Sequence, residues 1–473
     1  MKRILAFGGW IALLLVSLTG CLFGLAEDLY RLPEGSPGYE DLTQRINEVR
    51  SALEREYSAV VEYAQIYSGE HISTVQLQDL DGDGQRETAV TFFRLPGAER
   101  PLKIFFFTLQ PDESYRVTAA LEGDGAAINA VDYVDLNGEG LKEVVVSWQV
   151  SSGVYQLGVY SLDERMTHRG QSGLDGPAVP PLSSLLGTEL LSTNYSDYKL
   201  IDLDEDTQTE VAVVRLDQAG ENSTLDLYGW GDDGLGRQSS ARLSNGITAL
   251  RRVRTGYVAG ELPTPAIYVT SDLIDGAQAV DILAWRGNEV RNVVLDADTG
   301  VSRERLRLPE GVDLTDINGD AVLEIPHLRA LPSYGENAGD FWLTDWEQYD
   351  RYAECSSVCT TYHNIADGWY LEIPDHWRNR LTISRNDVTS GQRAVIFSLW
   401  NDAETEPTRF LVLYKLTGVN RATRATTGDR FILWEDANTI YSAAFYASGW
   451  DCGLDEAGVR ERFHLILPSW SND

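Results

Sequence analysis

The sequence is poor in cysteine, methionine, histidine and basic residues. It has four cysteines, two methionines and six histidines in 473 residues, too few cysteines for a disulfide scaffold. Cys355 and Cys359 are spaced like a zinc-ligand pair and His363 follows, but no fourth ligand lies close in the sequence. We therefore expect Cys355, Cys359 and Cys452 to form at most one disulfide or to remain free thiols.

Short catalytic motifs are also missing. The sequence contains no G-x-S-x-G, no H-E-x-x-H, no P-loop and no S-x-D-x-G-x-x-W Asp box. The six histidines are scattered, and none pairs with another at a metal-binding step on a recognisable helix. These absences predict no catalytic residues, and the first interpretation is that the chain is not an enzyme.

Positive charge is scarce. The chain has 39 basic and 72 acidic residues, which gives a net charge of −33. Such a surface repels nucleic acid and anionic lipid headgroups. We expect no nucleic-acid partner and a monomeric protein.

The only long apolar run lies at the start, in "MKRILAFGGWIALLLVSLTGC". Two basic residues precede this run and small residues precede Cys21, as in a secretory signal. The alternative is a membrane-spanning helix, but Ile4 to Leu18 falls short of the ~20 residues that a span needs. "LTGC" resembles a bacterial lipobox. The resemblance implies a signal peptide over 1–21, lipidation of Cys21, and a place on the extracytoplasmic face of the bacterial cell membrane.

Residues 22–37 contain prolines and glycines and predict a tether between the lipid and the folded part. A helical pattern then covers 38–67, because apolar residues recur at steps of three and four. We expect this N-terminal helix to pack on the domain that follows.

Four acidic nine-residue segments recur along the chain. "DLDGDGQRE" begins at Asp79, "DLNGEGLKE" at Asp135, "DLDEDTQTE" at Asp202 and "DINGDAVLE" at Asp316. Each has an acid or amide at positions one, three, five and nine, and strand-like sequences flank the loops. Ca²⁺ prefers such oxygen ligands in short glycine-rich loops, whereas the alternative is a solvated acidic turn without metal.

The segments begin 56, 67 and 114 residues apart, and the last interval is twice 57. Halfway along it, "RTGYVAGELPTPAIYVTS" keeps the strand pattern without the acids and predicts a fifth, degenerate repeat. A period of roughly 40–60 residues with about four strands per unit is typical of a β-propeller. The predicted fold is mainly β, with a propeller of about five (five to seven) blades over 68–352.

This pattern resembles the FG-GAP/VCBS repeats of integrin α-subunit propellers and bacterial surface proteins, over about Ser68 to Tyr352. The resemblance implies structural Ca²⁺ held in each hairpin loop by the side chains at positions one, three, five and nine. Glu205, Thr207 and Ala321 depart from it, because they replace expected glycines. The implied metal ligands are Asp79, Asp81, Asp83 and Glu87; Asp135, Asn137, Glu139 and Glu143; Asp202, Asp204, Asp206 and Glu210; and Asp316, Asn318, Asp320 and Glu324.

The period stops after Tyr352. Residues 353–473 predict a small C-terminal α+β domain on an antiparallel sheet, ending in a short helix and a strand. Five tryptophans in and beside the predicted strands are expected in the blade cores, with a sugar-binding role as the lesser alternative: Trp148, Trp230, Trp285, Trp342 and Trp346.

Two classes of function fit this sequence. In the first, a lipid-anchored, calcium-stabilised propeller is a non-catalytic module that binds a protein or a cell-wall or glycan ligand. In the second, the chain is an extracellular polysaccharide hydrolase or lyase with an acidic site at the propeller axis. A central pocket lined by converging acids and aromatics, with a raised carboxylate pKa, would favour the second class, whereas acids confined to the hairpin loops would favour the first.

Overall fold

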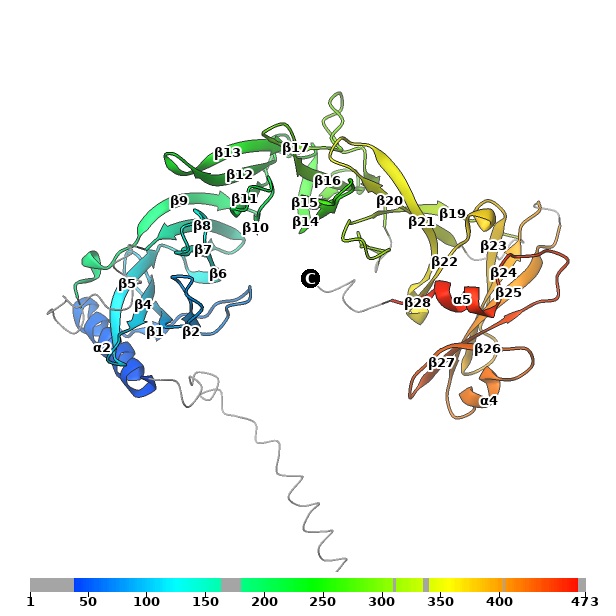
Figure 1. Cartoon of the computed structure of the whole chain (residues 1–473), viewed down its shortest axis with the longest axis horizontal. Helices are drawn as coiled ribbons and strands as arrows, with labels where there is room; N and C mark the ends of the chain where they lie inside the picture. Colours follow the sequence, from blue (N-terminus) through cyan, green and yellow to red (C-terminus); the bar gives the residue numbers. More distant parts are fainter. Residues whose placement is uncertain (1–37, 163–179, 309–311, 335–339, 403–404, 467–473) are drawn as a thin grey trace, which may run out of the picture. The chain divides into compact units, whose positions relative to one another are not determined.

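A computed structural model describes residues 38–162, 180–308, 312–334, 340–402 and 405–466 (Figure 1). The predicted signal peptide, Cys21 and the tether lie outside these ranges. Among the described residues, no helix is both long enough and apolar enough to cross a membrane.

The described chain is mainly β, as predicted. It forms six antiparallel sheets of four or five strands, and the strand order of each is open, with no closed barrel among them. Contacts divide the chain into two compact units, one of residues 1–202, 206–215 and 228–238, the other of 203–205, 216–227 and 239–473.

The first unit begins with a helix and two complete sheets. Helix α2 spans Tyr39–Tyr57. The first sheet has the order β1-β3-β4-β5, with β2 also paired to β3: β1 Glu62–Tyr63, β2 Val75–Gln78, β3 Thr88–Arg94, β4 Leu102–Leu109 and β5 Tyr115–Gly123. The second follows chain order: β6 Ala127–Val134, β7 Glu143–Ser151, β8 Val154–Ser161 and β9 Thr188–Tyr195, with the 3₁₀ turn η2 at Leu182–Ser184.

The division between the units passes through the third sheet, whose strands also follow chain order. They are β10 Asp197–Ile201, β11 Glu210–Arg215, β12 Thr224–Gly231 and β13 Gly234–Arg242.

The second unit contains three further sheets. The fourth is β14 Ile247–Val258, β15 Thr264–Leu273, β16 Gln278–Trp285 and β17 Val290–Asn292, with β18 Arg305–Leu306 also paired to β16. The fifth is β19 Ile325–Ala330, β20 Trp342–Tyr349, β21 Cys355–Asn364, β22 Trp369–Glu372 and β28 Phe463–Leu465. The sixth has the order β23-β24-β25-β27-β26: β23 Leu381–Asn386, β24 Gln392–Leu399, β25 Thr408–Thr417, β26 Phe431–Glu435 and β27 Thr439–Phe445.

Short helices accompany these sheets of the second unit. They are α4 Arg421–Ala425, α5 Glu456–Arg462, and the 3₁₀ turns η3 Ile365–Asp367 and η4 Asp375–Trp377. As expected from the sequence, the last helix leads directly into a strand, β28. The boundary predicted at 352/353 lies between β20 and β21, which pair with each other, so strands from both sides of it share the fifth sheet.

Within each unit, neighbouring sheets share apolar clusters. The β4 sequence "LKIFFFTL" is buried at every position, because α2 covers one face of the first sheet and the second sheet covers the other. In the second unit, one apolar cluster joins the fourth and fifth sheets, and another joins the fifth and sixth. Strands buried on both faces read as continuous apolar runs, which explains the sequences of β3 and β4.

The N-terminal helix is shorter than predicted. It ends at Tyr57, where Ser58 adopts a left-handed backbone with φ 51°, and β1 then pairs with β3. Val61 is buried, but Val60 is 73% exposed, so the apolar spacing beyond Tyr57 was not helical. The prediction of helix through residue 67 was therefore wrong, because pairing with the sheet edge replaces the last turns.

Candidate metal centre

Each acidic segment lies just before a strand. In the first three sheets this strand is the second in the strand order, whereas in the fifth sheet it is the first. The segments precede β3, β7, β11 and β19, and the degenerate repeat forms the corresponding β14–β15 hairpin without acids. Leu80, Leu136 and Leu203, at position two, are fully buried. These leucines anchor the loops in the apolar core, whereas the side chains at positions one, three and five are half-buried or exposed.

All four loops share one backbone conformation. Positions four and six have left-handed φ angles in each loop, including the non-glycine residues Glu205, Thr207 and Ala321. In the first loop, Asp79 accepts backbone hydrogen bonds from Gly82 at 2.8 Å and Gly84 at 3.0 Å. The same two bonds form to Asp135 and Asp316 in their loops. The sequence departures therefore did not change the turn.

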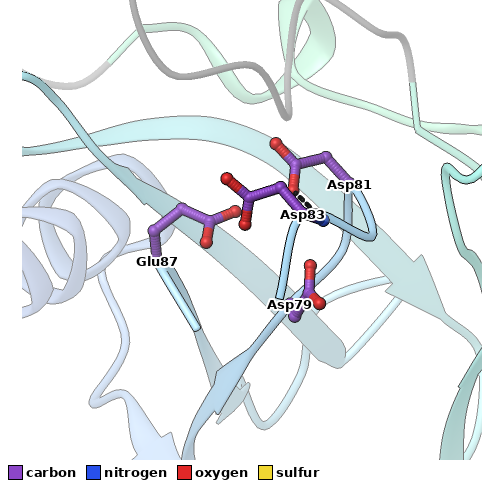
Figure 2. Close-up of side chains that lie close together, drawn as sticks. All are labelled: Asp79, Asp81, Asp83 and Glu87. Atoms are coloured by element: carbon purple, nitrogen blue, oxygen red, sulfur yellow. Dashed lines mark hydrogen bonds between the residues drawn. The ribbon is translucent and has the colours of Figure 1, made fainter. Parts of the chain in front are cut away.

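The first loop brings its four predicted ligands together (Figure 2). Asp79, Asp81, Asp83 and Glu87 each offer a carboxylate oxygen, and these oxygens all lie within 4.8 Å of one another. Backbone amides hold two of the aspartates: Asp83 N–H donates to Asp81 at 3.3 Å, and Gln85 N–H donates to Asp83 at 2.7 Å. Four carboxylates at this separation repel one another unless a cation or protons neutralise them.

Glu87 gives the first loop an independent sign of a missing ligand. The residue is only 3% exposed, and neither of its carboxylate oxygens has a hydrogen-bond partner. Figure 2 shows its carboxylate pointing toward the aspartates. Burial, followed by the charges of Asp81, Asp83 and Asp79, raises the pKa of Glu87 to about 7. A buried carboxylate without a partner is costly, whereas a bound divalent cation would satisfy both oxygens.

The second loop differs at this position. Glu143 is 1% exposed, but it accepts a hydrogen bond from Leu136 N–H at 2.9 Å and one from the Asn137 amide at 3.5 Å. Burial raises its pKa to about 6. Asn137 contributes an amide oxygen where the first loop has a carboxylate, so the negative charge here is lower.

In the loop from Asp316 to Glu324, one oxygen of the ninth residue has a hydrogen-bond partner and the other has none. One oxygen of Glu324 accepts from Ile317 N–H at 2.8 Å, and the other is buried without a partner. Burial raises the pKa of Glu324 to about 7. Asn318 donates to Asp320 at 2.9 Å, which turns one potential pair of ligands toward each other.

The third loop also groups its acids. Asp202, Asp204, Asp206 and Glu210 place carboxylate oxygens within 4.8 Å of one another. Thr207 N–H donates to Asp202 at 3.0 Å. Loops one and three are thus the two acidic groups that converge in the described residues, and acids in both could hold a metal ion.

The first two loops lie against each other. Lys142 N–H donates to Leu80 O at 2.8 Å, and a Cβ added to Gly82 would lie 2.7 Å from Gly140 O. Gly82 also has φ 72°. Glycine is therefore required at this position both by backbone angle and by the neighbouring loop.

Sequence reasoning missed a cleft in the second unit. It has a volume of about 990 Å³, and residues from β14, β18, β19 and β20 line it. Its polar and aromatic lining is Arg251, Gln278, Arg305, Arg307, His327 and Trp342. Trp342 is 47% exposed, so its prediction as a core residue was wrong, whereas Trp148 and Trp346 are buried as predicted.

His327 belongs to a cluster of titratable groups beside this cleft. Its Nε2 lies 3.1 Å from Glu304 and 3.4 Å from Glu347, and Tyr349 donates to Glu304. The hydrogen bond with Glu304 raises the pKa of His327. No sequence signal marked this cluster, because its members come from separate strands and lack a motif.

The three cysteines of the described part are free thiols. Burial raises the pKa of Cys355 to about 11 and that of Cys359 to about 12. Both therefore stay protonated at neutral pH, and of the two alternatives drawn from the sequence, free thiols hold.

Comparison with known proteins gave no sequence relative. No family model matches the chain, and no curated protein matches it. The FG-GAP/VCBS resemblance therefore stays a prediction.

Solved structures that resemble the chain do so distantly. An exotype rhamnogalacturonan lyase, YesX, is 10% identical with a TM-score of 0.24, covering 72% of this chain and 71% of its own. A Bacillus licheniformis rhamnogalacturonan lyase is 12% identical with a TM-score of 0.26, covering 74% and 71%. A Penicillium chrysogenum α-L-arabinanase is 12% identical with a TM-score of 0.20, covering 67% and 93%.

By their names, these solved structures are of enzymes that act on polysaccharides, and the prediction that the chain is not an enzyme is withdrawn. That prediction depended on the absence of short motifs. Catalytic groups for polysaccharide cleavage meet in space from distant positions, so missing motifs could not exclude them. TM-scores this far below 0.5 carry no argument for a particular activity.

Proposed function

We propose that the chain is a Ca²⁺-binding, propeller-type protein of the bacterial cell surface that engages polysaccharide. The observation that carries the calcium proposal is the first loop, where buried Glu87 leaves two oxygens without partners beside three converging aspartates. Hard carboxylate oxygens in a glycine-rich turn suit Ca²⁺, and extracellular modules typically bind it at ~10⁻⁴ to 10⁻³ M.

The propeller-type arrangement is supported by the regular place of the loops. Four- and five-stranded antiparallel sheets follow one another along the chain. An acidic loop or its degenerate counterpart precedes the second strand in four of the six, and an acidic loop precedes the first strand of the fifth sheet. The apolar clusters that neighbouring sheets share within each unit agree with blades. The number of blades belongs to the same proposal and stays at five to seven.

Calcium titration by calorimetry tests the metal proposal. The mature chain should bind Ca²⁺ with the affinity given above, and Asp79→Asn or Glu87→Gln should remove at least one site. Asp112→Asn is the matched control, since Asp112 lies in an ordinary β-turn and bonds to Ser114 at 2.6 Å. Unchanged stoichiometry in both variants would refute a metal site in the first loop.

The polysaccharide part is supported by the cleft beside Trp342. It combines a half-exposed indole with cationic and polar groups in a volume that a saccharide segment can enter. Saccharide binding belongs to the first class inferred from the sequence, and saccharide cleavage to the second. The acidic site that the second class requires is not among the residues that line this cleft. Binding of defined oligosaccharides to the mature chain tests the polysaccharide proposal.

The surface location is supported by the sequence alone. A basic start, an apolar run and "LTGC" before the tether favour acylation of Cys21. Cys21→Ser should shift the protein from the membrane fraction to the soluble fraction and remove label from a metabolic fatty-acid probe. Retention of the label in this variant would refute lipidation at Cys21.

A further inference from the structure

The charged side chains that line the cleft beside Trp342 are basic rather than acidic. Three arginines line it, from β14 and from β18 and the residue after it, although the chain carries a net charge of −33. Guanidinium groups recognise planar carboxylates through two parallel hydrogen bonds. A concentration of arginine on such an acidic protein therefore indicates an anionic ligand.

Acidic neighbours hold two of these arginines. Arg251 pairs with Asp272 and Arg305 pairs with Asp275, and the two arginine side chains remain 53% and 47% exposed. Arg307 makes no ion pair with any residue that the structure describes. The fixed pairs orient the cleft wall, while Arg307 keeps its donors for a ligand.

Trp342 lines both this cleft and a second hollow. The smaller hollow, of about 230 Å³, shares Leu328 and Trp342 with the cleft and is also lined by Phe341, Tyr362 and Arg385. An exposed indole offers a flat apolar surface, against which the C–H face of a sugar ring can pack. Two adjoining hollows across one tryptophan fit an extended chain better than a single small anion.

We propose that this cleft binds a carboxylate-bearing saccharide chain, with Arg307 contacting a carboxylate and Trp342 packing against a ring. The inference rests on the proposed polysaccharide function and names its substrate class. A saccharide has at most one carboxylate per ring. Single-stranded nucleic acid carries one charge per ~3.4 Å, and the acidic surface repels it more strongly.

Calorimetry with the mature chain in constant excess Ca²⁺ tests the assignment. The probes are a hexamer of galacturonic acid and a neutral galactose hexamer. We expect the acidic hexamer to bind at least tenfold more tightly, and its affinity to fall with added salt. Arg307→Gln should weaken binding of the acidic hexamer about tenfold and leave binding of the neutral hexamer unchanged. Trp342→Ala should weaken the binding of both hexamers.

Arg116→Gln is the matched control. Arg116 is an exposed arginine of β5 in the first unit, so its loss changes the net charge equally but leaves the cleft intact. It should change neither affinity, and melting curves of all variants should match that of the wild type within about 2 °C.

Each remaining result overturns the inference in a distinguishable way. Equal affinity for both hexamers, or no effect of Arg307→Gln, refutes carboxylate recognition and leaves the polysaccharide proposal in place. Binding of neither hexamer refutes both. A single-stranded DNA hexamer that binds as tightly as the acidic saccharide assigns the cleft to nucleic acid instead.

Discussion

At the residue scale, the ninth position of the loops combines burial with negative charge. Glu87, Glu143 and Glu324 are 3%, 1% and 0% exposed. Burial is the largest cause of the raised pKa of each, and neighbouring loop acids add to it. In the metal-free state these glutamates favour the protonated form, whereas a calcium ligand must be deprotonated.

This raised pKa predicts opposite effects of pH on the metal-free and calcium-bound protein. A carboxyl whose folded pKa is raised stabilises the fold fully below its unfolded pKa, near 4.5, and loses that contribution as pH rises through about 7. The melting temperature in chelator should therefore fall as pH is raised from 5 to 7.5. The increase in melting temperature that added Ca²⁺ produces should grow over the same range.

Differential scanning calorimetry at fixed ionic strength measures both trends. Glu87→Gln keeps a neutral group at this site at every pH. In chelator, the melting temperature of this variant should therefore fall less between pH 5 and 7.5 than that of the wild type. A calcium gain that is equal at pH 5 and pH 7.5 would contradict the role of these glutamates as ligands.

At the scale of one element, the loops keep their backbone conformation despite different residues. Ala321 adopts φ 71° where the first two loops have glycine. A left-handed angle costs a residue with a Cβ about 1–2 kcal/mol. Contacts of the loop with its strands outweigh this cost, which explains why loops without the expected glycines still form.

Replacing Ala321 with glycine should therefore stabilise the protein. Relief of the left-handed strain exceeds the extra backbone entropy of glycine in the unfolded chain, so we expect a gain of up to about 1 kcal/mol. Urea unfolding in excess Ca²⁺ measures it. The control Ala330→Gly, at an exposed end of β19, should lose about 0.5–1 kcal/mol, and a loss at both positions would show that Ala321 is not strained.

Helix α2 depends on a single apolar face. Leu42, Ile46, Val49 and Leu53 are buried in the same cluster as Phe93 and Phe105 of the first sheet. Their spacing repeats at three and four residues, so one stripe of the helix meets the sheet.

Truncating this stripe should destabilise the first unit. Ile46→Ala leaves a cavity against the sheet and should cost about 2–5 kcal/mol. Tryptophan fluorescence during urea unfolding measures the loss, and Asn47→Ala, on the exposed side of the same turn, should change it by less than about 0.5 kcal/mol. Equal effects of the two variants would mean that α2 does not dock as described.

At the scale of the whole molecule, the net charge of −33 and the acidic loops are linked. The first and third loops each concentrate four carboxylates within 4.8 Å. Mutual repulsion at such sites disfavours the folded state, and cation binding to the folded state alone stabilises it by mass action.

Removing calcium should therefore lower the melting temperature of the mature chain. At 1 mM Ca²⁺ and a Kd of ~10⁻⁴ M, each filled site adds about 1.4 kcal/mol. Calorimetry with chelator and then with restored Ca²⁺ measures the shift. Mg²⁺ at the same concentration is the control and should restore less, because it prefers strict octahedral geometry. Melting curves that coincide in chelator and in Ca²⁺ would contradict metal-held loops.

The local pattern of this sequence was sufficient to predict the hairpin loops, most strands and the buried stripe of α2. These features depend on residues close in sequence: acids and glycines within nine positions, and apolar residues repeating with the period of a strand or helix. The end of α2 and the exposure of Trp342 could not be predicted, because strand pairing and packing with distant segments decide them. The unpartnered oxygens of Glu87 and the meeting of Arg307 with Trp342 also became visible only in the tertiary structure, since burial and proximity across separate strands leave no mark in local sequence.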